Sequence, residues 1–195
     1  MFPDDRQLVA DFLGGDDRAF EQLVRRYLSP LYNFIFQLTR DRNVAEDLTQ
    51  ETFIKAWKHG ARFDQKKSFK TWIFTIAKNT TYDFFKKKKS IPFSFFEDDE
   101  GRNTLDMIDE DRPLPDEILE KTEKIEALEK ALAKVPELYR ALLLLAYRED
   151  FSLGEIAEIL GEPYNTIKSR HQRALKLLKR AFLDSDASAP EQETY

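Results

Sequence analysis

Apolar residues recur at helical spacing along most of this chain. Between residues 68 and 89, Phe69, Trp72, Ile73, Ile76 and Ala77 fall on one face of a helix that neither glycine nor proline interrupts. The same spacing predicts further helices at 8–13, 17–38, 45–59, 125–135, 138–147, 153–160 and 164–182. Because these segments cover most of the chain, the predicted fold class is all-α.

Residues at the predicted helix ends support these bounds. Asn43 and Ser152 are each followed three residues later by a glutamate, which fits the capping box that opens a helix. Ser68 can cap the helix that follows it, and Gly60 ends the preceding one. Pro30 lies inside the segment 17–38, but the apolar phase continues past it, so we expect a kink rather than a break.

The helical periodicity disappears between residues 90 and 116. This stretch contains three prolines, a glycine and a run of acidic residues, which predicts a flexible acidic linker. The sequence therefore predicts two small helical domains, at 1–89 and 117–183, followed by a disordered tail at 184–195.

The net charge of −5 conceals a strong segregation of charge. Residues 62–89 carry nine basic and two acidic groups, and residues 164–183 carry six basic groups and no acidic one. In contrast, residues 90–120 carry two basic and eleven acidic groups. The two basic segments favour binding to nucleic acid, since clustered lysine and arginine neutralise phosphates.

The composition argues against disulfides, metal sites and histidine-based catalysis. Without cysteine the chain has neither disulfides nor thiolate zinc sites, and two histidines leave little for metal or acid–base chemistry. We therefore predict no cofactor and no metal site. The N-terminal residues lack the basic start and apolar core of a signal peptide, and no apolar run is long enough to span a bilayer. A cytoplasmic protein is expected.

The segment 152–182 has the arrangement of a DNA-binding helix-turn-helix. A capped helix is followed by the turn Gly161–Pro163 and then by a basic helix, whose first residues would lie on base edges in the major groove. The predicted outer face of that helix holds Lys168, Arg170, Arg173, Lys176, Lys179 and Arg180. The predicted inward face holds Ile167, His171, Ala174 and Leu178. An ordinary helical hairpin with a solvated basic face is the alternative interpretation.

The helix predicted at 68–89 has a second face of cations, amides and rings that ends in four lysines. This face carries Phe74, Lys78, Asn79, Tyr82, Phe85 and Lys86. Rings can stack on unpaired bases while lysines neutralise phosphates, so the face suits a nucleic-acid strand whose bases are accessible. The alternative is an amphipathic core helix whose lysine end is only solvated.

Three segments resemble motifs of the extracytoplasmic-function (ECF) group of bacterial RNA polymerase sigma factors. They are AEDLTQETFIKAW, then FKTWIFTIAKN, and later LGEIAEILGEPYNTIKSRHQRAL, and the resemblance extends from about Asp16 to Phe182. It implies two helical domains joined by a flexible linker, in a protein that brings core RNA polymerase to promoter DNA. The polymerase performs the chemistry, so the resemblance implies that this chain is not an enzyme. An anti-sigma factor is a further expected partner, because such inhibitors are common in the group.

The resemblance also implies three sets of binding residues. The face that would bind core polymerase comprises Asp47, Gln50, Glu51 and Ile54. The residues that would melt and read the −10 element, with the loop 63–68 capturing an unstacked base, are Phe63, Lys66, Lys67, Ser68, Asn79, Asp83, Lys86 and Lys87. The residues that would read the −35 element are Asn165, Thr166, Lys168, Ser169, Gln172, Arg173 and Lys176.

Several alternatives stay open at this point. The polymerase-binding face could be a solvated polar face with local ion pairs, Trp72 could pack in the core, and Lys86–Lys89 could be solvated only. The group usually has glycine where Asn165 stands and an aliphatic residue where His171 stands, so the base preference of the last helix need not follow the group's. The alternative functions are a helix-turn-helix regulator that acts without polymerase, and a helical adaptor that binds acidic proteins.

Overall fold

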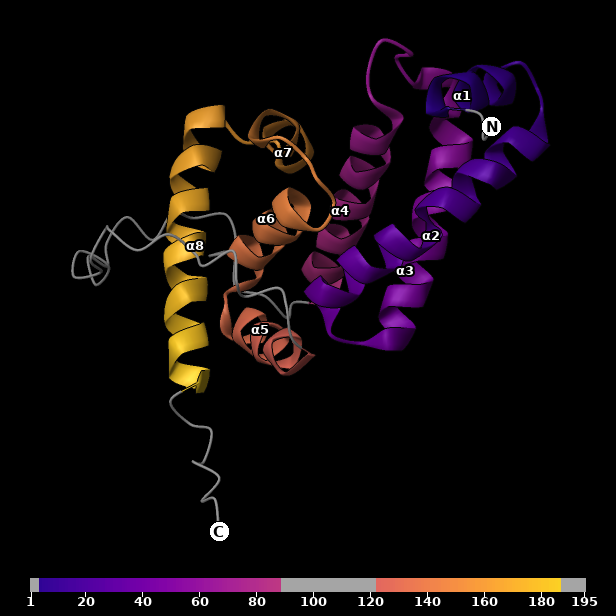
Figure 1. The fold of residues 1–195 in the computed structure, drawn as a ribbon. Coiled ribbons are helices and arrows are strands. Elements are labelled where there is room, and N and C mark those ends of the chain that lie inside the picture. The colour runs from indigo at the N-terminus through magenta and orange to yellow at the C-terminus, as the bar shows by residue number, and fades with distance from the viewer. Residues whose placement is uncertain (1–3, 89–121, 187–195) are drawn as a thin grey trace.

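The computed structural model describes residues 4–88 and 122–186, and within them every regular element is a helix (Figure 1). This confirms the predicted all-α fold class with two helical domains. The predicted linker at 90–116 lies outside the described residues, as does the tail beyond residue 186. No helix in the described ranges combines the length with the hydrophobicity that a membrane crossing requires.

Four α-helices and one short 3-10 helix form the first bundle: α1 (Asp5–Leu13), α2 (Asp17–Thr39), α3 (Arg42–His59), η1 (Gly60–Arg62) and α4 (Phe69–Lys88). The long helix α2 packs against α1, α3 and α4. Its apolar face contributes the fully buried side chains of Leu23, Leu31 and Ile35, and α4 contributes Ile73 and Ala77. The apolar stripe read from the sequence of 68–89 therefore faces the core of this bundle.

The ends of these helices follow the sequence closely, with one exception. Gly60 ends α3 as predicted, and α2 continues past Pro30 without a break. However, α3 is capped by Asp41, whose carboxylate accepts hydrogen bonds from the backbone nitrogens of Asn43 (3.0 Å) and Val44 (3.2 Å). The capping box predicted at Asn43 is therefore wrong, because a carboxylate two residues earlier already satisfies the first free N–H groups of the helix.

Four further helices form the second bundle: α5 (Thr122–Lys134), α6 (Glu137–Tyr147), α7 (Leu153–Leu160) and α8 (Tyr164–Asp186). The capping box at Ser152 is confirmed, since its hydroxyl accepts from the Glu155 backbone nitrogen and the Glu155 carboxylate accepts from the Ser152 backbone nitrogen. Gly161 ends α7 in the left-handed conformation at φ +73°, which glycine adopts at low cost. Helices α7 and α8 thus form the predicted helix-turn-helix, and α8 continues beyond its predicted end.

The two bundles pack directly against each other. Helix α4 lies against α7, and α2 lies against α6 (Figure 1). One apolar cluster runs through this contact and includes the fully buried side chains of Phe74 in α4 and Ile156 in α7. The rings of Phe74 and Phe151 meet edge to face, with centroids 5.1 Å apart. The helix faces that make this contact are therefore not exposed in the described arrangement.

Three cations also bridge the bundles, each by donating to a main-chain carbonyl oxygen of the opposite bundle. The pairs are Lys70 with Glu149, Lys78 with Leu160 (3.4 Å), and Arg140 with Gln37 (2.9 Å). Each carbonyl lies in the last turn of a helix or just beyond it. Because carbonyl groups at a helix C-terminus carry partial negative charge, a cation is favoured at each of these positions.

This contact contradicts two expectations about exposed faces. Phe74, Lys78 and Tyr82 were expected to face nucleic acid, but only 0%, 9% and 9% of their surfaces are accessible. Arg170 was expected on the outer face of α8, but it is 5% exposed and forms an ion pair with Glu162 at 3.2 Å. Helical spacing determines which residues share a face, whereas the covering of that face depends on elements far away in the sequence.

Candidate functional site

The face of α3 expected to bind polymerase is exposed. Asp47, Gln50, Glu51 and Ile54 are accessible and share one side of the helix, and Ile54 exposes 53% of its surface. Glu51 also forms an ion pair with Lys55 at 2.8 Å. The local pairing that the alternative interpretation expects is therefore present at one of the four positions.

Trp57 extends this face, although the sequence analysis did not select it. Trp57 is 44% exposed and lies three residues after Ile54. It packs against Phe12 of α1 and Phe20 of α2, with ring centroids 5.1 and 5.0 Å apart. The indole therefore fixes the end of α3 to the rest of the first bundle and leaves an apolar surface beside Ile54. The sequence did contain a sign of this position, because Trp57 lies three residues after Ile54 and therefore on the same side of the helix.

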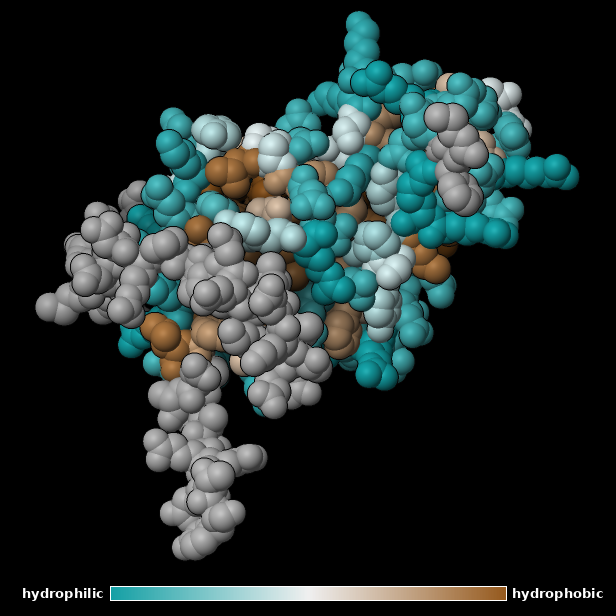
Figure 2. All heavy atoms as spheres, in the orientation of Figure 1, coloured by the Kyte–Doolittle hydropathy of each residue, from teal (hydrophilic) through white to brown (hydrophobic). Residues whose placement is uncertain are grey.

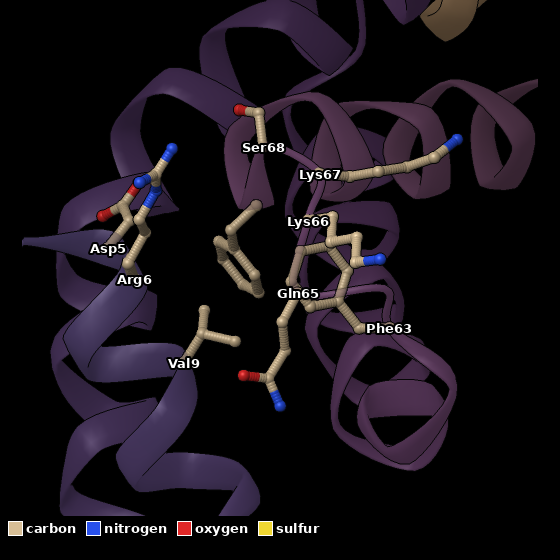
Figure 3. A pocket seen from close by; sticks show the side chains of 9 residues that line it. Asp5, Arg6, Val9, Phe63, Gln65, Lys66, Lys67 and Ser68 are labelled. Carbon is tan, nitrogen blue, oxygen red and sulfur yellow. The ribbon is translucent and has the colours of Figure 1, made fainter.

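The loop between η1 and α4 forms one side of a cavity of about 450 Å³ (Figure 3). Lys66, Lys67 and Ser68 are exposed and contribute to its lining. Asp64 shapes the loop, since its carboxylate accepts from the Lys66 backbone nitrogen at 3.0 Å and its carbonyl accepts from that of Lys67 at 2.9 Å. In the space-filling view, hydrophilic side chains project from this end of the molecule (Figure 2).

Phe63 begins this loop but does not lie on its surface. It is 8% exposed, and its ring packs against Trp72 and Phe69 with centroids 4.9 and 5.9 Å apart. Trp72 is itself half-buried against the core, as its core-packing interpretation expects. Phe63 therefore contributes an apolar floor to the cavity, and stacking on a freely exposed Phe63 ring is excluded in this arrangement.

Four of the α4 residues expected to contact the −10 element are exposed, namely Asn79, Asp83, Lys86 and Lys87. The first three are four and three residues apart, so they share one side of the helix. The neighbouring side is covered by the second bundle. There, burial lowers the pKa of Lys78, partly offset by the charge of Glu162, and burial raises the pKa of Tyr82.

The first half of α8 presents most of its predicted −35 residues to solvent. The exposed ones are Asn165, Lys168, Ser169, Gln172 and Arg173, while Thr166 and Lys176 are half-buried. The Ser169 hydroxyl donates to the Thr166 carbonyl at 3.0 Å, so it is oriented by its own helix. The exposed set lies at the start of α8, where a recognition helix contacts base edges.

His171 lies at the edge of the core rather than within it. The side chain is half-buried, its ring stacks on that of Tyr147, and Nε2 is 3.1 Å from the Tyr147 hydroxyl oxygen. Burial lowers the pKa of the imidazole, in the direction expected from the sequence. The inward orientation is therefore correct, but Tyr147 is 61% exposed and leaves this edge open to water.

Comparison with family models places both bundles in one family. Residues 23–91 match the model described as sigma-70 region 2, and residues 125–178 match the model described as sigma-70 region 4. The first match covers most of α2–α4, and the second covers α7 and most of the helices around it.

Curated proteins of the same family align along most of the chain. The chain is 32% identical over 174 residues to the ECF RNA polymerase sigma factor SigW of Bacillus subtilis (strain 168), covering 87% of this chain and 92% of the relative. It is 28% identical over 187 residues to the RNA polymerase sigma-H factor of Pseudomonas aeruginosa, covering 91% and 93%.

Solved structures with the same fold include two protein complexes. The sigma factor RpoE, in complex with the anti-sigma factor NepR from Bartonella quintana, matches with a TM-score of 0.63 at 27% identity, covering 84% of this chain and 96% of that chain. CnrH, in complex with the cytosolic domain of CnrY, matches with a TM-score of 0.65 at 24% identity, covering 93% and 98%. The likeness to CnrH concerns the fold alone.

Proposed function

The chain belongs to the ECF family of RNA polymerase sigma factors, and we propose that three exposed helix faces divide its work between the polymerase and the promoter. As a sigma factor, the protein binds core RNA polymerase and directs it to specific promoters for transcription initiation. Family membership leaves no place for the two alternatives, a regulator that acts without polymerase and an adaptor for acidic proteins. The observation that carries the proposal is that most of the expected contact residues of each set are exposed on the expected helix.

The first face is the side of α3 that carries Asp47, Gln50, Glu51 and Ile54. We assign it to core polymerase because it combines acceptors and an exposed aliphatic side chain, and Trp57 adds further apolar surface. A mixed surface of this kind suits a protein partner, in which apolar anchors are surrounded by polar contacts. It does not suit DNA, since its two carboxylates would repel phosphates.

The second face combines the loop 63–68 with the exposed side of α4. Asn79 can pair with a base edge, Lys86 and Lys87 can neutralise phosphates, and the cavity beside the loop can hold one base outside the stack. Unstacking a base costs a few kcal/mol, which contacts in a pocket can offset. We therefore assign melting and reading of the −10 element to this face.

The third face is the start of α8, which we assign to the −35 element. Arginine can bond to guanine through two donors, and asparagine or glutamine can do the same with adenine, so Arg173, Asn165 and Gln172 are the candidate base readers. Lys168 and Lys176 would contact phosphates. Accordingly, we propose that residues 1–89 and 117–183 act as separate domains on the promoter.

The contact between the bundles has to break for both elements to be bound at once. The −35 and −10 elements are about 25 base pairs apart, which is roughly 85 Å of duplex at about 3.4 Å per base pair. In contrast, α4 packs against α7, which immediately precedes the recognition helix α8. The structure therefore corresponds to a closed form, and promoter binding by the holoenzyme requires an open one.

An anti-sigma factor is a fitting partner for the closed form. The related RpoE structure, 27% identical to this chain, is a complex with an anti-sigma factor. A protein that binds both bundles at once would hold them together and keep Lys78 and Arg170 covered. We further propose that the chain supplies no catalytic group to RNA synthesis and acts in the cytoplasm, where polymerase and chromosome are found.

The assignment of the α3 face can be tested with the double variant Asp47→Ala, Gln50→Ala. Both side chains are exposed, so the fold should persist while the affinity for core polymerase falls at least tenfold in a pull-down or titration. Run-off transcription from a genomic library should fall in parallel, and sequencing of its start sites gives the promoter.

A matched double variant controls for the loss of a carboxylate and an amide. Asp17→Ala with Gln22→Ala changes the same chemical groups at exposed positions of α2 and should leave polymerase affinity within twofold. Unchanged affinity for the α3 double variant would show that polymerase binds elsewhere on the chain.

A further inference from the structure

Helix α1 encloses the cavity beside the loop 63–68 from the opposite side. Arg6 and Val9 of α1 face Phe63, Gln65 and the first residue of α4, Phe69, across a space of about 450 Å³ (Figure 3). A volume of this size lies within the range of roughly 300–1,000 Å³ that is usual for small-molecule sites. The loop therefore supplies only one wall, and the N-terminal helix supplies another.

The chemistry of this cavity changes from its floor to its rim. Val9, Phe63 and Phe69 are buried and form an apolar floor, with 3%, 8% and 5% of their surfaces exposed. Exposed groups at the rim supply amide and cationic donors, among them Gln65 and Arg6. A nucleotide has the complementary features, because its base has apolar faces and polar edges and its phosphate is an anion.

The wall formed by α1 is fixed to the floor by a cluster of polar and aromatic contacts. The Asp5 carboxylate accepts hydrogen bonds from the Arg26 guanidinium and from the Tyr27 hydroxyl. The Tyr27 ring is 5% exposed and packs against Phe69, with centroids 5.7 Å apart. Asp5 thus acts as a positioning residue that holds α1 beside the cavity, and the next residue along the helix is Arg6.

We propose that helix α1 forms the second wall of the site that receives one unstacked promoter base, and that Arg6 contacts this nucleotide and contributes to its selection. The inference rests on the proposed function of the loop 63–68. A guanidinium is planar and has five donors, so it can stack on a base, bond to a base edge or bond to the adjacent phosphate. The cations of the loop itself, Lys66 and Lys67, are compact point charges without the planar fork of donors that a guanidinium presents.

The test uses holoenzyme assembled from core polymerase and the full chain. Its DNA is a fork-junction fragment of a promoter found by run-off mapping, in which each −10 base of the single strand is replaced in turn by an abasic site. For the wild-type chain we expect one position where removing the base weakens binding roughly five- to hundredfold, as stacking and pocket contacts imply.

Two exposed residues allow the cavity to be altered without disturbing the core. Gln65→Trp would fill it from the loop, and Arg6→Ala would remove the α1 donor. For both variants, the loss of affinity caused by the abasic site at that position should be at least threefold smaller than for the wild type. Binding to the upstream duplex and the melting temperature should stay at wild-type values. Arg18→Ala, an exposed arginine of α2 outside the cavity lining, should keep the full wild-type loss.

The outcomes separate this inference from the function on which it rests. If no abasic position weakens wild-type binding, base capture by the loop 63–68 is wrong and the inference falls with it. If the wild type shows the loss, Gln65→Trp removes it and Arg6→Ala keeps it, the loop captures the base without Arg6 and our inference is overturned. If both variants keep the loss, the base is bound outside this cavity.

Discussion

Removing one cation from the contact between the bundles should open the molecule. Lys70 of α4 donates to the carbonyl oxygen of Glu149, and its Nζ lies 4.5 Å from the centroid of the Phe151 ring. A hydrogen bond from a charged donor contributes about 1.5–3 kcal/mol and a cation–π contact about 0.5–1 kcal/mol. Because Lys70 is only half-buried, solvent screens both, and we expect Lys70→Met to weaken docking by about 2 kcal/mol.

A loss of this size is large enough to measure as a change in population. It raises the ratio of open to closed molecules roughly thirtyfold. A chain that is about 99% closed would then become about one quarter open. The methionine keeps the length of the aliphatic stem, so the apolar contact of α4 should change little.

The assay benefits from the absence of cysteine in this chain. Lys58→Cys in α3 and Arg180→Cys in α8 are exposed positions in different bundles, and a dye on each reports the distance between them by single-molecule energy transfer. The control is Lys67→Met, the same substitution three residues earlier, at a side chain that lines the cavity. An unchanged distance distribution for Lys70→Met would refute the reasoning, and so would an equal change for Lys67→Met.

Two further predictions concern α8. Arg173→Ala should cost about 1–3 kcal/mol on the specific −35 element and little on a scrambled one, whereas Lys179→Ala should weaken both and reduce the salt dependence. Equal losses on both sequences for Arg173→Ala would contradict base reading. Burial lowers the pKa of His171, so the folded chain binds its proton less readily than the unfolded chain does. The stabilisation is therefore complete above the unfolded pKa of about 6.5 and is lost as the pH falls below it. The melting temperature of the full chain should fall between about pH 7 and 5, and His171→Leu should remove part of that fall; parallel pH profiles for the two proteins would exclude this role.

Local sequence patterns predicted the helices and most of their ends. The capping box at Ser152 was readable because all of its partners lie within four residues. The failure at Asn43 has a local cause as well, since Asp41 precedes it and a carboxylate at that position competes for the same N–H groups. Such signals need no knowledge of the tertiary fold.

The contact between the bundles could not be predicted in the same way. Arg140 shows why, because nothing near it in the sequence indicates that it is buried. Its guanidinium donates to carbonyl oxygens of Ala133 and Val135 at the end of α5 and to Gln37 in the last turn of α2. Burial, with the charge of Arg40, lowers its pKa, and the carbonyls of two helix ends replace water around it.

The role of α1 escaped prediction for a related reason. Its apolar residues indicate a short helix that packs on a core, and that is correct for Leu8 and Val9. The bond from Tyr27 to Asp5 spans 22 residues, and tertiary contacts of this kind place Arg6 beside a loop almost 60 positions away. Sequence spacing shows which residues share a face of a helix. A site formed by three elements can be recognised only when the relative positions of those elements are known.

The chemistry of the bridging contacts is compatible with a closed form that is stable alone and that opens when DNA binds. Lys70 and Lys78 donate to uncharged carbonyl oxygens at helix ends rather than to carboxylates. Phosphates carry a full negative charge and form stronger hydrogen bonds with ammonium groups than carbonyls do. In addition, burial disfavours the charged form of Lys78. Moving this ammonium group from the closed form to a solvated phosphate would therefore remove a desolvation cost. Under the proposed function, promoter DNA would compete with the second bundle for these cations of α4, and opening of the molecule would be linked to recognition of the −10 element.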